Sequence, residues 1–218
     1  MTLIFDNLIS TVVAMTVVLI LASVQLRATK QNIAGTSHYV TKQHTKQLSS
    51  WLQEDLGKIG KNMGDESVPV DTMVVANDDS TAKWLTKELV FERDSIGTGG
   101  NRVRVKVRYD VQKTGTRTIG GEERDVFQLA RERKVGSDPW ESAGGGAATL
   151  EYFDVDMLNK DAGLVEDPVE KLQSNPDTVR SVRIRFSVVP PFQNDQLPVS
   201  ASRTNTVVAQ YLPADPWD

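Results

Sequence analysis

The feature that most constrains this chain is an uncharged stretch near its N-terminus, from Asn7 to Leu26. About 20 helical residues, at about 1.5 Å each, span the roughly 30 Å hydrocarbon layer of a bilayer. Its few hydroxyl side chains can bond to the carbonyl groups of their own helix, which makes them tolerable in lipid; they are Ser10, Thr11, Thr16 and Ser23. A cleavable signal peptide is the alternative, but no basic run precedes the apolar part and Gln25-Leu26-Arg27 is a poor cleavage site. The stretch predicts a transmembrane helix over about residues 7–26.

The helix is expected to continue well beyond the membrane. No strong turn signal follows Leu26 before Gly57 and Gly60, and apolar residues recur mostly at helical steps: Ile33, Val40, Leu48, Leu52, Leu56, Ile59 and Met63. We expect Trp51, Leu52 and Leu56 to pack on the protein's own globular part, and Gly35 to be a weak point or bend, since glycine disfavours helix. The pattern predicts a helical segment over residues 1–62 and a globular domain over 63–218.

The orientation of the helix in a membrane follows from its flanking charges. Arg27, Lys30, Lys42 and Lys46 follow the uncharged stretch, whereas Asp6 and the terminal amine precede it. The positive-inside rule, applied to these residues alone, places the globular part in the cytoplasm.

The rest of the chain alternates with a period of two. The segment from Arg102 to Tyr109 has apolar residues at every second position, and Arg180 to Val189 repeats the pattern until Pro190-Pro191 ends it. Further predicted strands are 72–77, 85–93, 125–133, 150–154 and 206–212, and the polar stretch 114–123 is predicted to be a long hairpin loop. A helix followed by strands predicts an α+β fold: a long N-terminal helix, transmembrane in its first half and amphipathic in its second, packed on a β-rich, mainly antiparallel domain.

Composition and spacing argue against several classes of function. The chain of 218 residues has no cysteine, which excludes disulfides and thiolate chemistry, and its net charge of -4 gives no bulk attraction for nucleic acid. The two histidines, His38 and His44, are six residues apart and do not share a helix face as a metal pair would. The sequence contains no recognisable motif that would place a catalytic nucleophile next to a general base. We expect no enzyme activity, no cofactor, no nucleic-acid partner and no small-molecule substrate.

Two polar clusters in the sequence are candidate binding sites. The strand face formed by Arg102, Arg104, Lys106 and Arg108 is either an interaction face for an acidic partner or a solvated sheet surface. A second cluster resembles a calcium loop in composition but lacks the glycine and the last glutamate of that motif; its members are Asp154, Asp156, Asn159 and Asp161. We interpret it as a polar turn, with calcium as the weaker hypothesis.

The layout resembles the type IV pilins and the pseudopilins of type II secretion systems. The opening Met1-Thr2-Leu3-Ile4 is similar to the start of a mature pilin. Two further runs, 148–154 and 179–186, and the segment Val126-Phe127-Gln128-Leu129-Ala130-Arg131 are similar to the larger minor subunits, the J-type pseudopilins and W-type minor pilins. Such families have a glutamate at the fifth mature position, where this chain has Phe5 followed by Asp6. They also carry a basic leader that a peptidase removes; such a leader before Met1 would reverse the orientation given above.

The resemblance implies a function in assembly. Met1 and Asp6 would set the register between neighbouring subunits, and the filament core would include Val12, Val13, Val17, Leu19 and Leu21. The partners would be other pilin-like subunits, in a homo- or hetero-polymer. The protein would sit in the inner membrane as a single-pass protein, with its domain periplasmic or extracellular, until it joins the filament. Two alternatives stay open: a monomeric membrane-anchored binding module or accessory subunit of a membrane complex, and an anchored enzyme of unrecognised type.

Overall fold

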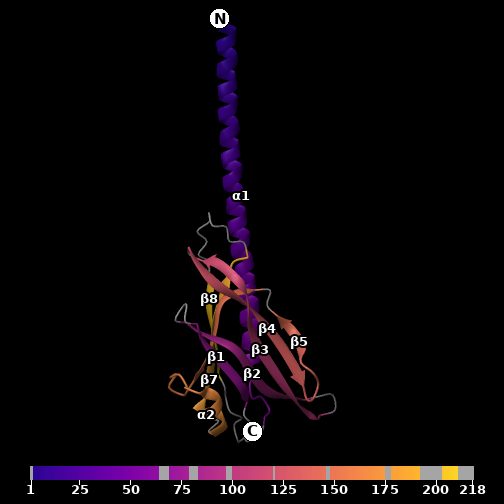
Figure 1. Ribbon diagram of the computed structural model, residues 1–218. Helices are drawn as coiled ribbons and strands as arrows, with labels where there is room; N and C mark the ends of the chain where they lie inside the picture. The colour runs from indigo at the N-terminus through magenta and orange to yellow at the C-terminus, as the bar shows by residue number, and fades with distance from the viewer. Residues whose placement is uncertain are drawn as a thin grey trace.

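The predicted α+β architecture is confirmed by a computed structural model of the chain (Figure 1). The structure describes residues 2–63, 69–78, 83–96, 100–119, 121–145, 148–174, 178–191 and 203–210. Of these it describes only the backbone at residues 2–4, 6, 76–78, 83–84, 145 and 203–210. One long helix enters a β-rich domain at one end and projects far beyond it at the other.

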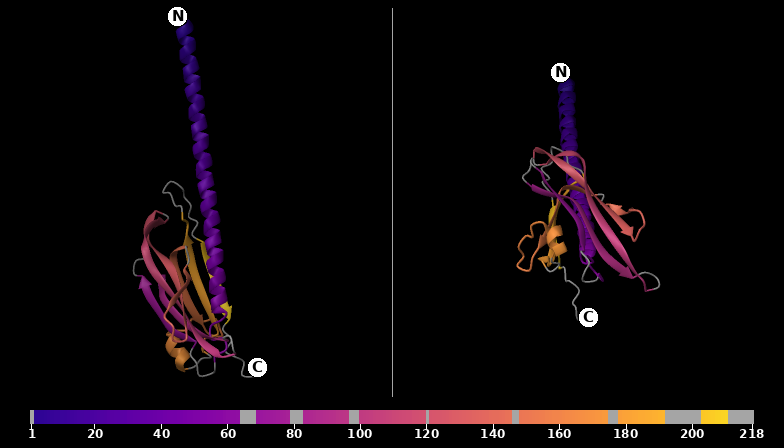
Figure 2. Two further views of the ribbon diagram at one scale, coloured as in Figure 1. Left: turned by 90° about the vertical axis from the view of Figure 1, so that its right-hand side faces the viewer. Right: turned by 60° about the horizontal axis from the view of Figure 1, so that its bottom comes forward.

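Helix α1 (Thr2–Leu56) is a single element of 55 residues, about 80 Å long at the usual helical rise. It ends at Leu56, so the predicted helical segment 1–62 is too long at its C-terminal end: residues 57–62 form turns, and Gly60 has a left-handed φ of 68°. The predicted weak point at Gly35 does not interrupt the helix, which runs straight through it (Figure 2). Gly35 is exposed and no side chain lies near it, so nothing there forces a bend.

The sheet has eight strands, and every pairing in the described part of the chain is antiparallel. The strands are β1 (Val70–Asp78), β2 (Lys83–Ile96), β3 (Arg102–Ile119), β4 (Glu122–Val135), β5 (Glu141–Gly145), β6 (Thr149–Leu158), β7 (Ser181–Val189) and β8 (Arg203–Gln210). Their order across the sheet is β1-β2-β3-β4-β6-β7-β8, with β5 paired to β4 beside β6. A short helix, α2 (Pro168–Ser174), precedes β7. The sequence predicted neither β5 nor α2, and residues 211–212 of the last predicted strand lie outside the described residues.

The prediction of a long loop over residues 114–123 is wrong. Strand β3 continues to Ile119 and β4 begins at Glu122, with Arg117 opposite Arg124 in the ladder. The turn contains Gly121 in a left-handed conformation, with φ of 88°. Most side chains of this hairpin arm are exposed, so its composition is polar like that of a loop, while the cross-strand hydrogen bonds hold it extended.

The amphipathic half of α1 covers the sheet, as predicted. Leu52 is fully buried in the main core, Leu48 and Leu56 are nearly so, and Trp51 packs partly against the same core. Strands β7 and β8 lie along the helix (Figure 2). Under the helix the largest buried rings are stacked, with the centres of Phe91 and Tyr109 6.1 Å apart.

The sheet is curled strongly enough to bring non-neighbouring strands together. Strand β2 contacts β6 although β3 and β4 lie between them in the strand order. The backbone amide of Val155 donates a hydrogen bond of 3.0 Å to the fully buried hydroxyl of Thr86. Helix α2 contacts β1 across the same side. The right-handed twist of a large antiparallel sheet favours this arrangement.

Candidate membrane and assembly surface

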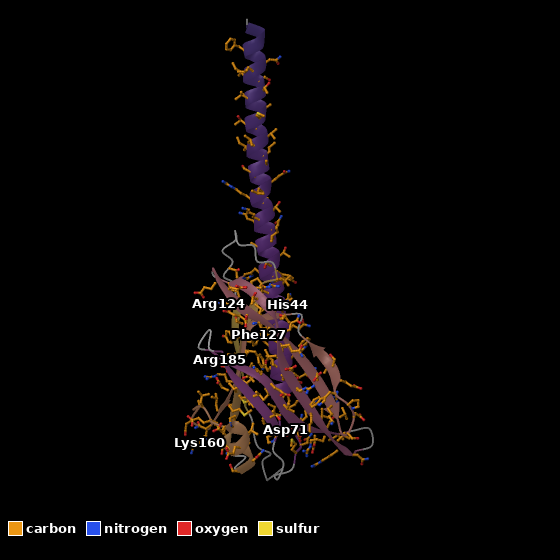
Figure 3. The ribbon with its side chains drawn as sticks, in the orientation of Figure 1. His44, Asp71, Arg124, Phe127, Lys160 and Arg185 are labelled. Atoms are coloured by element: carbon orange, nitrogen blue, oxygen red, sulfur yellow. The ribbon has the colours of Figure 1, made fainter. Side chains whose placement is uncertain are left out.

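The projecting half of α1 is the largest apolar surface that the structure leaves uncovered. Its side chains radiate with no other segment beside them (Figure 3). The exposed apolar residues are Phe5, Leu8, Ile9, Val12, Val13, Met15, Val17, Val18, Leu19, Ile20, Leu21, Val24 and Leu26. Helix α1 is long and apolar enough to cross a membrane, and none of its most apolar window is buried in the domain. It is therefore compatible with a membrane anchor and differs from the buried central helix of a soluble core.

Three of the four hydroxyl groups predicted to bond to their own helix, those of Thr11, Thr16 and Ser23, do so. Thr11 donates to the carbonyl of Asn7 at 2.7 Å, and Thr16 donates to that of Val12 at 2.8 Å. Ser23 donates to the carbonyl of Ile20 at 2.8 Å. These bonds remove most of the cost of placing the hydroxyls in hydrocarbon.

The residues predicted for assembly fall into two groups. Val12, Val13, Val17, Leu19 and Leu21 are exposed by 49 to 69% and spread over more than half of the helix circumference. Met1 lies outside the described residues, and Asp6 is part of α1 but its side chain is not described. The suggested pairing of Asp6 with a neighbouring amine therefore stays a prediction.

Where α1 enters the domain, small hydroxyl residues form a buried stripe that the sequence reasoning missed. Ser37, Thr41 and Thr45 are at most 4% exposed and lie four residues apart, in line with Leu48 and Leu52. Thr41 and Thr45 each donate a 2.8 Å hydrogen bond to the carbonyl four residues earlier. Self-satisfied small side chains let a helix lie close to a neighbouring element. The signal was the unbroken four-residue spacing of hydroxyl residues.

A buried charge cluster fixes the end of α1 to the sheet. The Asp55 carboxylate, whose side chain is 3% exposed, accepts two hydrogen bonds from Arg131 on β4, at 2.7 and 2.8 Å. It also accepts one from the phenol of Tyr109 on β3. Arg131 additionally donates to the carbonyl of Ala143 at 2.8 Å. Burial and the neighbouring Asp55 carboxylate raise the pKa of Tyr109 well above its ordinary value. We call Asp55, Arg131 and Tyr109 together the Asp55 clamp.

The basic strand face is mostly paired within the sheet. Arg104 donates to Glu92 and Asp94, both at 2.7 Å. These hydrogen bonds, Glu92 first, raise the pKa of the guanidinium. Lys106 bonds Asp71 at 3.2 Å, and Arg108 bonds Glu132 and stacks 4.7 Å from the Trp140 ring centre. Arg102 donates a long hydrogen bond of 3.5 Å to the Asn62 carbonyl. Acids on β1, β2 and β4 thus neutralise much of this face.

The second polar cluster is not one polar turn. Asp154 and Asp156 lie in β6 and bind Arg185 and Arg183 of β7, respectively. Burial, followed by the nearby Asp156, raises the pKa of the Asp154 carboxyl. Asn159 and Asp161 lie in the turn beyond, where Asn159 accepts the amides of Asp161 and Gly163 at 2.9 Å. In the part of the chain that the structure describes, no group of three or more His, Asp or Glu side chains could hold a metal ion.

Comparison of the chain with protein-family models, with curated proteins and with solved structures found no match.

Proposed function

We propose that this chain is a structural subunit of a filament of the type IV pilus or type II secretion pseudopilus kind. Before assembly the apolar half of α1 holds it in the inner membrane, with the domain on the periplasmic or extracellular side. During assembly the same half leaves lipid and packs against other such helices. The similarity of the sequence to larger minor subunits favours a J-type or W-type role.

One observation carries the proposal: a continuous helix that is fixed in the domain at one end and fully uncovered at the other. Each exposed valine, leucine or isoleucine forgoes about 1.5–3 kcal/mol that burial would give, and α1 exposes more than ten such residues. That surface needs lipid or other helices around it. Between helices in lipid, van der Waals contacts supply the attraction, and the same contacts stabilise a bundle outside it.

The fixed end supports a polymer in particular. The buried leucines of α1 and the Asp55 clamp prevent the helix from turning relative to the sheet. Each subunit therefore presents its apolar half at one angle to its domain. A repeated contact between two different surfaces at a constant angle builds an open helical array, unless the rotation closes it into a ring.

The test is an Asp6→Ala variant of the full chain, produced in the native cells beside a Ser10→Ala control. Both variants are expected to stay in the membrane fraction, because neither adds a charge to the apolar stretch. We expect Asp6→Ala to be lost from surface filaments viewed by electron microscopy with antibody labelling, while the control is incorporated as the parent is.

Normal incorporation of Asp6→Ala would remove Asp6 from the assembly mechanism. Complete absence of filaments in cells that make the parent chain would instead favour the alternative, a monomeric membrane-anchored binding module. Mass spectrometry of the first residue adds a second criterion, since N-methylation is expected of a processed pilin-like subunit.

A further inference from the structure

The curl of the sheet creates an open groove between β1, β6 and α2, with a volume of about 750 Å3. One wall is apolar and includes Met73 and Val75 of the sheet-edge strand β1, with Leu164 near its mouth. Val75 and Leu164 are 41% and 62% exposed. The groove therefore offers accessible apolar surface beside β1, the strand at the edge of the sheet.

The other wall of this groove is acidic. Among the residues that the structure describes, its charged lining consists of five carboxylates and one guanidinium, that of Arg185. Asp154 and Asp156 at the base are bound to arginines, whereas Glu166, Asp167 and Glu170 are exposed at the rim. We call this surface the acidic groove. An apolar wall under an acidic rim fits a partner that combines a ring or aliphatic chain with cationic groups.

The same chain carries a surface of that chemistry on α1. Tyr39, Lys42 and Lys46 are exposed and lie three and four residues apart, so they share one helix face. The buried stripe of Thr41 and Thr45 occupies a different part of the helix circumference, and all three side chains of this face are exposed. No acid occurs in the sequence between Asp6 and Glu54. We call it the Tyr39 face. With a net charge of -4 overall and a cationic helix, the acidic excess lies in the domain.

The groove cannot receive the Tyr39 face of its own chain. Helix α2 lies at the end of the domain farthest from the projecting helix (Figure 1), whereas Tyr39 and Lys46 lie about 15–25 Å before the end of α1 at the usual helical rise. A contact between the two surfaces must therefore join different copies. Because the two surfaces differ, such a contact leaves one of each free and can repeat.

We propose that the acidic groove of one subunit receives the Tyr39 face of the next subunit. This inference rests on the proposed filament function and adds the domain-level contact to it. The Tyr39 ring lies against the apolar wall at Val75 and Leu164, and Lys42 and Lys46 meet the rim acids Glu166 and Glu170. The contact lies outside the apolar core of the filament and sets the axial stagger between subunits.

Charge reversal in the full chain tests this pairing. Lys42→Glu/Lys46→Glu and Glu166→Lys/Glu170→Lys are each expected to reduce filament number at least about tenfold, because like charges then face each other. Combining all four substitutions in one chain is expected to restore filaments, since the attraction returns with opposite sign. Lys87→Glu, at an exposed position on β2, is the matched control and should change little.

Disulfide trapping provides a second measurement, in a chain that has no cysteine of its own. A Tyr39→Cys chain coexpressed with a Gln173→Cys chain is expected to give a mixed dimer on mild oxidation, whereas neither chain alone should.

Filaments that persist in both charge-reversed variants without that dimer would overturn the groove contact and leave the filament function intact. Absence of filaments from the parent chain would instead contradict the proposed function itself. Loss of filaments in both reversed variants without rescue in the fourfold variant would also overturn the pairing.

Discussion

Replacing Asp55 by alanine is expected to lower the free energy of unfolding by about 3–5 kcal/mol, because the change leaves a charged Arg131 half-buried without its carboxylate. The carboxylate accepts both Arg131 hydrogen bonds and that of the Tyr109 phenol. Arg131→Ala is expected to cost a similar amount, since it leaves the Asp55 charge buried. Urea unfolding of the full chain in detergent, followed by tryptophan fluorescence, measures both.

The double variant Asp55→Ala/Arg131→Ala separates the clamp from a simple loss of packing. Its destabilisation should be smaller than the two single effects together by about 0.5–3 kcal/mol, because the interaction is lost only once. Glu54→Ala, next to Asp55 but exposed and paired with Lys58 of its own helix end, is the control and should leave the unfolding midpoint nearly unchanged. Strictly additive single effects would show that Asp55 and Arg131 do not act as a pair.

A pair of lysines in the projecting half of α1 is expected to release the protein from the membrane. Each lysine at the centre of a membrane-spanning helix costs about 2.5–3.5 kcal/mol, and Val13→Lys/Val17→Lys places two on one face. We expect most of the variant to appear in the soluble or aggregated fraction after carbonate extraction, whereas the parent remains in the membrane pellet. The domain should keep its fold, because Val13 and Val17 are exposed and belong to the apolar half of α1.

The matched control is Val13→Leu/Val17→Leu, which preserves the apolar character and should behave as the parent does. Limited proteolysis checks the fold of the domain in each variant. A lysine variant that is retained in the pellet as fully as the parent would argue against this half of α1 as a membrane anchor.

Much of the fold could be predicted because it follows from short-range patterns. The uncharged stretch, the helical recurrence through Leu52 and Leu56, and the alternation around Val105 and Ile184 each depend on residues close in sequence. The structure confirms the helix, its packing through Leu52 and the antiparallel strands.

The errors have two physical causes. The hairpin arm around Arg117 and Arg124 is mostly exposed on both faces, so no hydrophobic alternation marks it. Acids are disfavoured in strands, so the polar-turn interpretation takes in Asp156 and also Asp154, the last residue of the predicted strand 150–154; arginines on β7 supply the counter-charges of both. In both cases pairing with a neighbouring strand, and not the local preference of the residues, determines that the segment is a strand.

The candidate site was predictable only in its apolar part. The projecting half of α1 is visible in the sequence, but the Asp55 clamp joins residues 76 positions apart, and no local pattern links Asp55 to Arg131. The acidic groove likewise depends on the curl that brings β1 near β6 and α2. Such sites require the tertiary arrangement of the strands.

The most direct test of the central claim places a photoreactive amino acid at Val13, Val17 or Leu21 in the full chain, in cells that produce it. If the apolar half of α1 leaves lipid to pack against other subunits, irradiation gives covalent adducts between chains at one or more of these positions. The same amino acid at the exposed Gln47 should give far fewer adducts with that half of a neighbour. Membrane-bound chains that yield only monomers at all three positions would contradict the claim that this helix serves in assembly.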